Sequence, residues 1–432
     1  MTVSKDRETP GVYVTEFDAF PPSIVGVATA VPIFIGYTQK AELSGRGVLF
    51  KPVKIASRAD YALIYGGDGG TAFNLQESIQ LFYANGGGSC YVVSVGDYSG
   101  AVDAAKLTQG LAAAAEQAGP TMIVIPDAVL LPADPPPPPA AKPGAPSPAP
   151  APNPLPAIAR SKAFATLVRA MLAQCGTLRD RVALLDLYGA EAIDTASPKA
   201  LQDGLDACVT NFREDVGEAH LGYGMAYFPP LRIVLGAAGR LLPPSGAMAG
   251  IYTMIDDTRG VWSAPANVII DGIAGLSLSL DNDQQGPLNM PLDGKAINAI
   301  RNFVGRGPVV WGARTLDGNS LDWRYIQVRR TILYIEQSIK TALNPFVFAA
   351  NDGATWTTAT SMISSFLQQL WAQGGLMGDK ASDAFTVQCG LGSTMTGQDI
   401  LDGYMIVNVT LQMIRPAEFI ALTFKQQMRG VT

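Results

Sequence analysis

Both ends of the chain alternate as β-strands do, and neither end has a strand partner nearby in the sequence. Residues 10–17 alternate branched and aromatic side chains after a Pro-Gly pair, and Ile420, Leu422 and Phe424 share one face at a period of two. A terminal strand exposes a row of unpaired backbone donors and acceptors, so it must dock on its own domain or join a sheet in another chain. The first fate is the commoner one, and the second would make this protein a subunit of a polymer.

The composition favours a chain whose surface is covered in its working state. The 432 residues suffice for two or three domains. Charged residues make up only 16% of the chain, against about 25% in typical soluble domains. This scarcity predicts a surface that copies of the same chain cover. The net charge of −6 and the lack of any basic run argue against a nucleic-acid partner.

Targeting and redox signals are weak. The first residues lack the apolar stretch of a signal peptide, and the longest apolar run, Ile24–Gly36, is too short to span a bilayer and contains Pro32. We therefore expect no direct insertion into a membrane. The four cysteines are widely spaced and form no CxxC pair, so buried free thiols in a reducing cytoplasm are expected.

From Ile33 onward, strands and helices alternate. Apolar strands are predicted at Ile33–Gly36, Cys90–Val95, Thr121–Pro126 and Arg181–Asp186, with helices between them. This rhythm is typical of βαβ units with a parallel sheet. A run rich in proline and alanine, Pro132–Pro156, interrupts it. Such a segment prefers extended polyproline geometry, and because the rhythm resumes directly afterwards we interpret it as an insertion in a surface loop.

Past Gly305 the pattern changes to α+β. Long helices are predicted at Trp323–Ala342 and Thr357–Gln373, and strands at Phe385–Gln388 and Met405–Met413. The expected organisation is an N-terminal arm (1–22), an α/β domain (23–305) carrying the insertion 132–156, an α+β domain (306–415) and a C-terminal arm (416–432).

The sequence offers little catalytic chemistry. His220 is the only histidine, which removes most hydrolase and zinc sites, and no phosphate-binding or dinucleotide-binding glycine motif is present. We therefore predict no catalytic, cofactor-binding or metal-binding residue. The alternative is a subtilisin-like hydrolase, because Asp186, His220 and Ser393 occur in the subtilisin order. Their local motifs do not fit that family. Elsewhere in the α/β part, Ser245 is expected to cap a helix at 246–259.

Several motifs occur in one order along the chain. They are Pro10–Glu16, Ile24–Thr29, Thr258–Asn267, Trp311–Leu316, Trp323–Arg330, Glu336–Ile339, Phe348–Asp352, Gln373–Gly378 and Arg415–Phe419. In these motifs the chain resembles, over nearly its whole length, the tail sheath proteins of contractile bacteriophages and of phage-tail-like injection systems. The Pro-rich segment lies outside the pattern, which implies an outward-facing decoration.

The resemblance implies a structural protein rather than an enzyme. It implies a non-catalytic subtilisin-like α/β domain, an α+β C-terminal sheath domain and extended β-strand arms at both termini. Subunits of this family form hexameric rings that stack helically around an inner tube protein, between baseplate and terminator proteins, and contract to drive the tube through a target envelope. Assembly in the bacterial cytoplasm, as part of a phage tail, a tailocin or another injection system, is implied as well. A static tail or capsid-like subunit is the alternative.

The resemblance also assigns the terminal strands a role. It implies that the arms donate strands to neighbouring subunits, through Val12, Tyr13, Val14 and Thr15 at one end and Phe419, Ile420, Leu422 and Phe424 at the other. Arg324, Arg329 and Arg330 are candidates for ion pairs between subunits. The alternative for these three is a solvated helix face, where a pair contributes at most about 1 kcal/mol.

Overall fold

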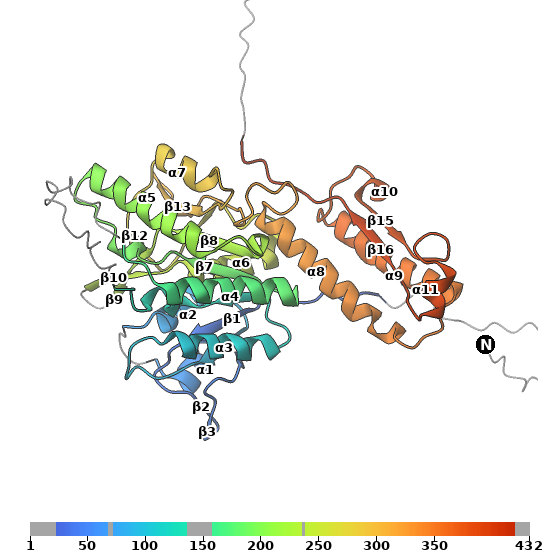
Figure 1. Ribbon diagram of the computed structural model, residues 1–432, viewed down its shortest axis with the longest axis horizontal. Helices are drawn as coiled ribbons and strands as arrows, with labels where there is room; N and C mark the ends of the chain where they lie inside the picture. The colour runs from blue at the N-terminus through green and yellow to red at the C-terminus, as the bar shows by residue number, and fades with distance from the viewer. Residues whose placement is uncertain (1–22, 68–71, 136–157, 236–237, 420–432) are drawn as a thin grey trace, which may run out of the picture. The chain divides into compact units, whose positions relative to one another are not determined.

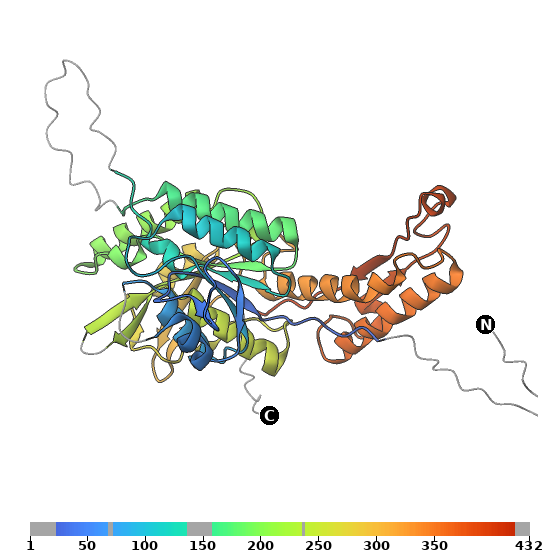
Figure 2. The ribbon, with the colours of Figure 1, turned by 90° about the horizontal axis from the view of Figure 1, so that it is seen from below.

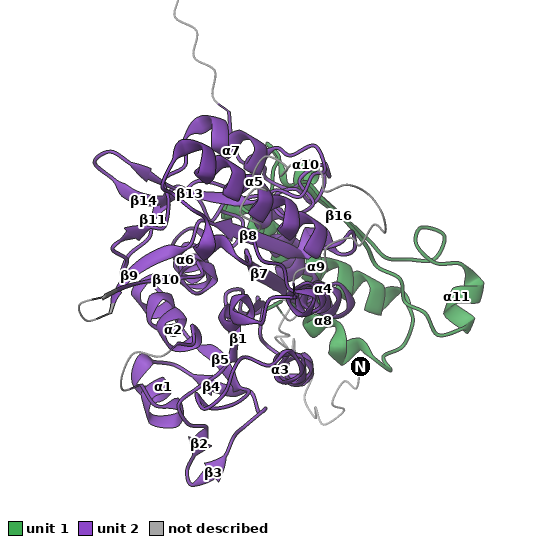
Figure 3. Cartoon of the chain, turned by 60° about the vertical axis from the view of Figure 1, so that its left-hand side comes forward, with its two compact units in different colours: residues 1–25, 338–412 green, residues 26–337, 413–432 purple. Residues whose placement is uncertain are grey.

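The computed structural model describes residues 23–67, 72–135, 158–235 and 238–419 (Figure 1). Of the arm residues expected to contact neighbours, only Phe419 lies inside these ranges. The chain forms two compact units (Figure 3). The large unit comprises Gly26–Gln337 and Met413–Thr432, and the small unit comprises Met1–Val25 and Ser338–Gln412.

A nine-stranded sheet organises the large unit, in the order β11-β14-β13-β8-β7-β6-β1-β5-β4. Six neighbouring strands run parallel: β1 (Pro32–Gly36), β5 (Cys90–Ser94), β6 (Met122–Val124), β7 (Val182–Asp186), β8 (Gly224–Phe228) and β13 (Asn298–Phe303). Antiparallel pairings add β4 (Val53–Ile55) at one edge, and β14 (Gly307–Val310) followed by β11 (Val268–Ile269) at the other. The predicted parallel sheet is thus present.

Helices cover both faces of this sheet (Figure 2). One layer contains α3 (Ala104–Glu116), α4 (Lys162–Leu178) and α5 (Pro198–Asp215), and the other contains α1 (Arg58–Tyr65), α2 (Leu75–Ala84) and α6 (Ser245–Arg259). Successive strand residues alternate between the two cores: Ile33 and Ile35 pack with the first layer, and Phe34 packs with the second. Because both faces are buried, these strands are continuous apolar runs rather than alternating ones.

Smaller elements decorate the large unit. A hairpin joins β2 (Glu42–Leu43) to β3 (Arg46–Gly47), and a second sheet has the order β10-β9-β12. Its strands are β9 (Leu231–Leu235), β10 (Ala238–Leu242) and β12 (Gly275–Leu276), and α7 spans Asn282–Asn289. Short helical turns, η1 (Pro126–Leu130), η2 (Ala190–Ala192) and η3 (Leu221–Tyr223), follow or precede the main strands. No helix among the described residues is long and apolar enough to cross a membrane.

Most of the Pro-rich insertion lies outside the described residues, but its two flanks are well defined. The Asp134 N–H donates to the Arg160 carbonyl at 2.7 Å, and the Asp134 carboxylate accepts the Lys162 N–H at 3.0 Å. Ser161 then caps α4 by accepting from the Phe164 N–H. The chain therefore leaves and re-enters the large unit at one point, as an inserted loop requires.

The small unit contains two long helices and a two-stranded sheet. Its elements are the end of α8 (Ile326–Leu343), η4 (Asn344–Phe346), α9 (Gly353–Ala372), α10 (Ala381–Ala384), β15 (Phe385–Gln388), α11 (Gly397–Leu401) and β16 (Asn408–Leu411). Both predicted long helices are present. The compact units divide at Gln337 and Ser338, within α8, rather than near residue 305, because β14 and the segment after it pack with the large sheet.

Candidate inter-subunit interface

The structure separates the residues of the hydrolase alternative. Asp186 ends β7, whereas His220 precedes β8, which runs parallel to β7 beside it. The two residues therefore lie at opposite ends of these parallel strands, roughly 15 Å apart for five-residue strands. The His220 ring packs directly on Gly176 of α4, where no Cβ would fit. This placement excludes an Asp–His pair, so the residues of the subtilisin order form no catalytic triad.

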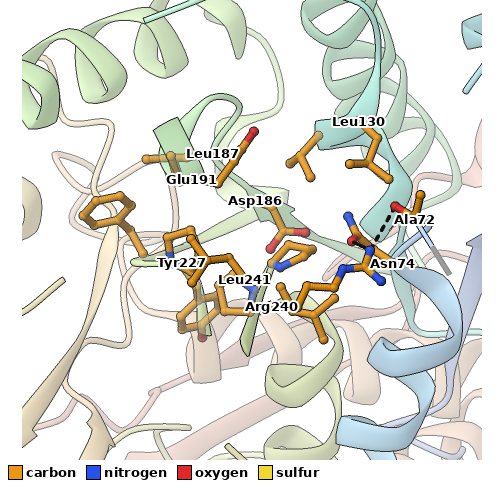
Figure 4. A pocket seen from close by; sticks show the side chains of 16 residues that line it. Ala72, Asn74, Leu130, Asp186, Leu187, Glu191, Tyr227, Arg240 and Leu241 are labelled. Carbon is orange, nitrogen blue, oxygen red and sulfur yellow. Dashed lines mark hydrogen bonds between the residues drawn. The ribbon is translucent and has the colours of Figure 1, made fainter. Parts of the chain in front are cut away.

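Asp186 instead accepts hydrogen bonds from the start of α6. Its carboxylate accepts the Ser245 N–H at 3.0 Å and the Ser245 hydroxyl at 2.6 Å. The prediction that Ser245 caps this helix is wrong, since Pro244 is the N-cap residue and Ser245 lies inside the first turn. Burial raises the pKa of Asp186 to about 7. The adjoining cavity of about 130 Å³ is lined by Asp186, Glu191 and Arg240 among others (Figure 4), and its lining contains no serine, threonine, cysteine or lysine that could serve as a nucleophile beside these carboxylates.

A second buried carboxylate fills the crevice between β1 and β6, where the strand order of the parallel sheet reverses. Asp127 accepts the N–H groups of Tyr37 at 2.7 Å and of Asn74, at the start of α2, at 2.6 Å. Ligands of doubly wound sheets bind at this position, and a helix N-terminus there holds phosphate. In this chain the Asp127 carboxylate occupies the N-terminus of α2. Burial raises the pKa of Asp127 to about 6. The described residues also contain no cluster of potential metal ligands.

The small unit contains a sheet of two strands, β15 and β16, among its described residues. The strands pair antiparallel, with Phe385 opposite Leu411 and Gln388 opposite Asn408. No third strand pairs with either one within the described part of the chain, although the Met377 N–H bonds the Gln412 carbonyl just beyond β16. A two-stranded sheet is only marginally stable alone in water, and both its edges present unpaired backbone groups.

The two faces of this sheet differ. Thr386, Gln388, Asn408 and Thr410 are exposed, whereas Phe385, Val387, Val409 and Leu411 are only half-buried. Helix α9 packs against β15, so the half-buried face is the one that the helix covers. Because no further strand of the described residues pairs with the outer edge of β15 or of β16, an extended segment can pair with the backbone at each edge.

The three arginines predicted to pair between subunits have different surroundings. Arg330 is nearly fully buried and bonds the Asp256 carboxylate through both terminal nitrogens, at 2.8 and 2.6 Å. Arg329 donates to the Gly222 carbonyl, and its guanidinium lies 3.5 Å from the centroid of the Trp323 ring. These two arginines are therefore engaged within the large unit, on a buried helix face rather than a solvated one. Arg324 is half-exposed and bonds the Ser320 carbonyl, so it remains a candidate for an inter-subunit pair.

Sequence reasoning missed Arg314, which lies in the densest of the motifs. Its guanidinium bonds both carboxylate oxygens of Glu418, with the Nε atom 3.0 Å from Oε1 and 3.2 Å from Oε2. Glu418 itself belongs to the Arg415–Phe419 motif. The sequence signal for this pair is that Arg314 and Glu418 each lie in a motif shared with the sheath family, Trp311–Leu316 and Arg415–Phe419. Beyond Glu418, the Phe419 side chain is 71% exposed.

Known proteins resemble the chain in part by sequence and as a whole by structure. Residues 319–427 match the model of the phage tail sheath C-terminal domain. A stretch of 149 residues is 29% identical to the tail sheath protein of Burkholderia phage BcepMu, covering 33% of this chain and 31% of the phage protein. The sheath complex of the extracellular contractile injection system PVC, in its contracted state, is 31% identical with a TM-score of 0.70, over 99% of each chain. The contracted helical sheath of the anti-feeding prophage is 31% identical with a TM-score of 0.71, covering 98% of this chain and 100% of that one.

Fold, site and relatives agree on a class. The relatives found by sequence and by structure are structural tail sheath proteins, not enzymes. The chain belongs to the family of contractile tail sheath proteins.

Proposed function

We propose that this protein is the structural subunit of a contractile sheath in a phage tail or a phage-tail-like injection system. The observation that carries the proposal is the resemblance to sheath subunits in their contracted state, at 31% identity over 98% of this chain and all of the compared one. The subunits form hexameric rings stacked around an inner tube, and contraction drives that tube through a target envelope. Baseplate and terminator proteins close the ends, and assembly takes place in the bacterial cytoplasm.

The terminal arms supply the connections between subunits. Val12–Thr15 and Phe419–Phe424 add as strands to the open edges of β15 and β16 in neighbouring copies. What supports this is the match between two strand-like ends and a sheet with two free edges. Strand addition is carried by main-chain hydrogen bonds, so the connection can persist while the attached domains rotate. The α/β unit acts as a non-catalytic, subtilisin-like body that these connections carry.

Contraction requires no nucleotide under this proposal. A sequence with two packings that differ by a few kcal/mol per subunit stores sufficient free energy in the higher one. The extended sheath is the metastable packing, and larger contacts between subunits stabilise the contracted one. The crevice filled by Asp127 agrees with a subunit that binds no phosphate ligand there.

The test is to co-express the full chain with its inner tube protein and to image the product by electron microscopy. Ordered helical sheaths in a long state and in a short, wide state are expected, and a single static form would favour the tail or capsid alternative. Deleting Met1–Glu16 should leave a folded subunit that builds no sheath. Ordered sheaths built by that deletion variant would contradict the role of the arms.

A further inference from the structure

The C-terminal arm leaves from the large unit, although most of the chain just before it belongs to the small one. Residues up to Gln412 pack in the small unit, and Met413 onward belongs to the large unit. Within this last described segment, Glu418 makes the ionic contact with Arg314. The side chain of Arg314 is 4% exposed and that of Glu418 is 17% exposed, so the pair is largely shielded from water.

Arg314 is held rigidly before it meets Glu418. Its N–H donates to the Asn298 side-chain oxygen at 2.7 Å, and its carbonyl accepts from the Asn298 side-chain nitrogen at 2.8 Å. Asn298 lies on β13, a strand inside the large sheet, and is itself 1% exposed. Tyr325 closes the other side, with its ring centroid 5.9 Å from the Arg314 guanidinium.

Neighbouring glycine packing fixes the same segment. A Cβ on Gly312 would lie 2.9 Å from the Asn298 oxygen and 3.0 Å from its Cα, so this position requires glycine. The Arg314 backbone is therefore held by the sheet. Its planar guanidinium fixes both the position and the orientation of the carboxylate that it binds. Beyond that contact, a groove of about 740 Å³ is lined by Pro416–Phe419 on one side and by Trp311 and Met290 among others.

We propose that Arg314 and Glu418, here called the anchor pair, fix the direction in which the C-terminal arm leaves the large unit and so direct it to the acceptor sheet of a neighbouring copy. This inference rests on the proposed exchange of arms. The anchor pair has a positioning role. It fixes the point at which the arm starts, and the backbone of the arm itself pairs with the neighbouring sheet. A pull on the arm is transmitted through Glu418 and Arg314 to β13, in the interior of the nine-stranded sheet.

The geometric part is tested on the unassembled full-length subunit by distance measurement between two spin labels. The labels are placed on Asp283→Cys in α7 and on Ala417→Cys, both exposed positions, in a Cys389→Ser background because the other three cysteines are buried. We expect one narrow distance distribution, at least twofold broader with Glu418→Ala or Arg314→Met. Glu218→Ala, which removes the exposed carboxylate that pairs with the buried Lys295, is the matched control and should leave the width unchanged.

The functional part uses the same substitutions without labels and counts sheaths in micrographs. Each anchor variant should keep its circular dichroism spectrum and form at least tenfold fewer sheaths than the control. The double variant should form about as many sheaths as either single variant, because both substitutions remove the same contact. Unchanged label distances in the anchor variants, or broad distances with normal sheath numbers, would overturn the inference.

A deletion separates this inference from the proposal beneath it. If removing residues 420–432 leaves assembly intact, the arm proposal itself fails. If that deletion abolishes assembly while Glu418→Ala assembles normally, only the positioning role of the anchor pair is overturned.

Discussion

The nine-stranded sheet of the large unit and the two-stranded sheet of the small unit solve the problem of sheet edges differently. The large sheet buries both faces under helices, and short strands end it: two-residue β11 at one edge and three-residue β4 at the other. Short edge strands discourage pairing with another chain. The small sheet has one covered face and two open edges. The large sheet thus ends in its own short strands, whereas no third strand of the described residues covers either edge of the small sheet, where we propose that arms of other copies pair.

Backbone hydrogen exchange provides the largest expected contrast. In unassembled subunits, amides of β7 should exchange only through unfolding, whereas those of β15 and β16 should exchange through local opening. On assembly, the amides of β15 and β16 should slow by at least a hundredfold and those of β7 should not change. Mass spectrometry of free subunits and of sheaths makes the comparison. Equal rates for β15 and β16 in both samples would mean that no strand is added there.

The pH dependence of stability distinguishes the two units by sign. In the large unit, burial raises the pKa of Asp186 to about 7 and that of Asp127 to about 6, above the unfolded value near 4. The folded state then binds more protons than the unfolded state between pH 4 and pH 7. The free energy of unfolding of this unit therefore falls as the pH rises through that window, by up to about 1.4 kcal/mol per pH unit for each carboxyl group.

The small unit should behave in the opposite way. Asp352 is the exposed N-cap residue of α9, and Asp399 is the third residue of α11, in a capping box with Thr396; backbone N–H donors lower the pKa values of both. Their contribution is present above the unfolded pKa and is lost as the pH falls below it. Urea unfolding from pH 2 to pH 8 checks both signs, because the small unit loses its contribution only below about pH 4. Asp186→Asn should flatten the slope of the large unit between pH 4 and pH 7. A slope that survives in this variant and in Asp127→Asn would refute the assignment.

Truncating one side chain in each sheet compares their packing. Leu184 of β7 is 1% exposed, so Leu184→Ala should lower the free energy of unfolding by about 3 kcal/mol through lost burial and a cavity. Val409 of β16 is half-buried, so Val409→Ala should cost less than about 1 kcal/mol in the free subunit. Chemical denaturation measures both values. A cost for Val409→Ala as large as for Leu184→Ala would show that the small sheet is already a closed core.

The sequence predicted the large sheet because its evidence is local. Continuous apolar strands such as Cys90–Ser94, separated by amphipathic helices, allow few arrangements other than a covered parallel sheet. The two long helices and Phe385–Gln388 followed from periodicity in the same way. Phe419 is the only residue of the expected arm contacts that the structure describes, so the arms themselves stay a prediction.

The missed features depend on contacts distant in sequence. Arg329 and Arg330 are adjacent on α8, and the sequence left them as candidates for ion pairs between subunits or as part of a solvated helix face. Only the fold brings Asp256 against Arg330, 74 positions away, and Glu418 against Arg314, 104 positions away. Ser245 has the residue type of a cap, but the carboxylate of Asp186 draws it into the first turn of α6. Periodicity holds no information about such partners.

Replacing the Pro-rich insertion should have the smallest effect on stability and assembly. Because Asp134 and Arg160 close its base with a 2.7 Å hydrogen bond, residues 136–157 can be replaced by a short Gly-Ser linker without moving α4. Shortening this 22-residue segment to about 6 residues changes its closure cost by only about 1 kcal/mol, in the stabilising direction. The melting temperature and the number of sheaths per micrograph should therefore stay near those of the full chain. Loss of sheaths from a subunit that melts normally would instead make the insertion a third contact between copies, beside the open edges of β15 and β16.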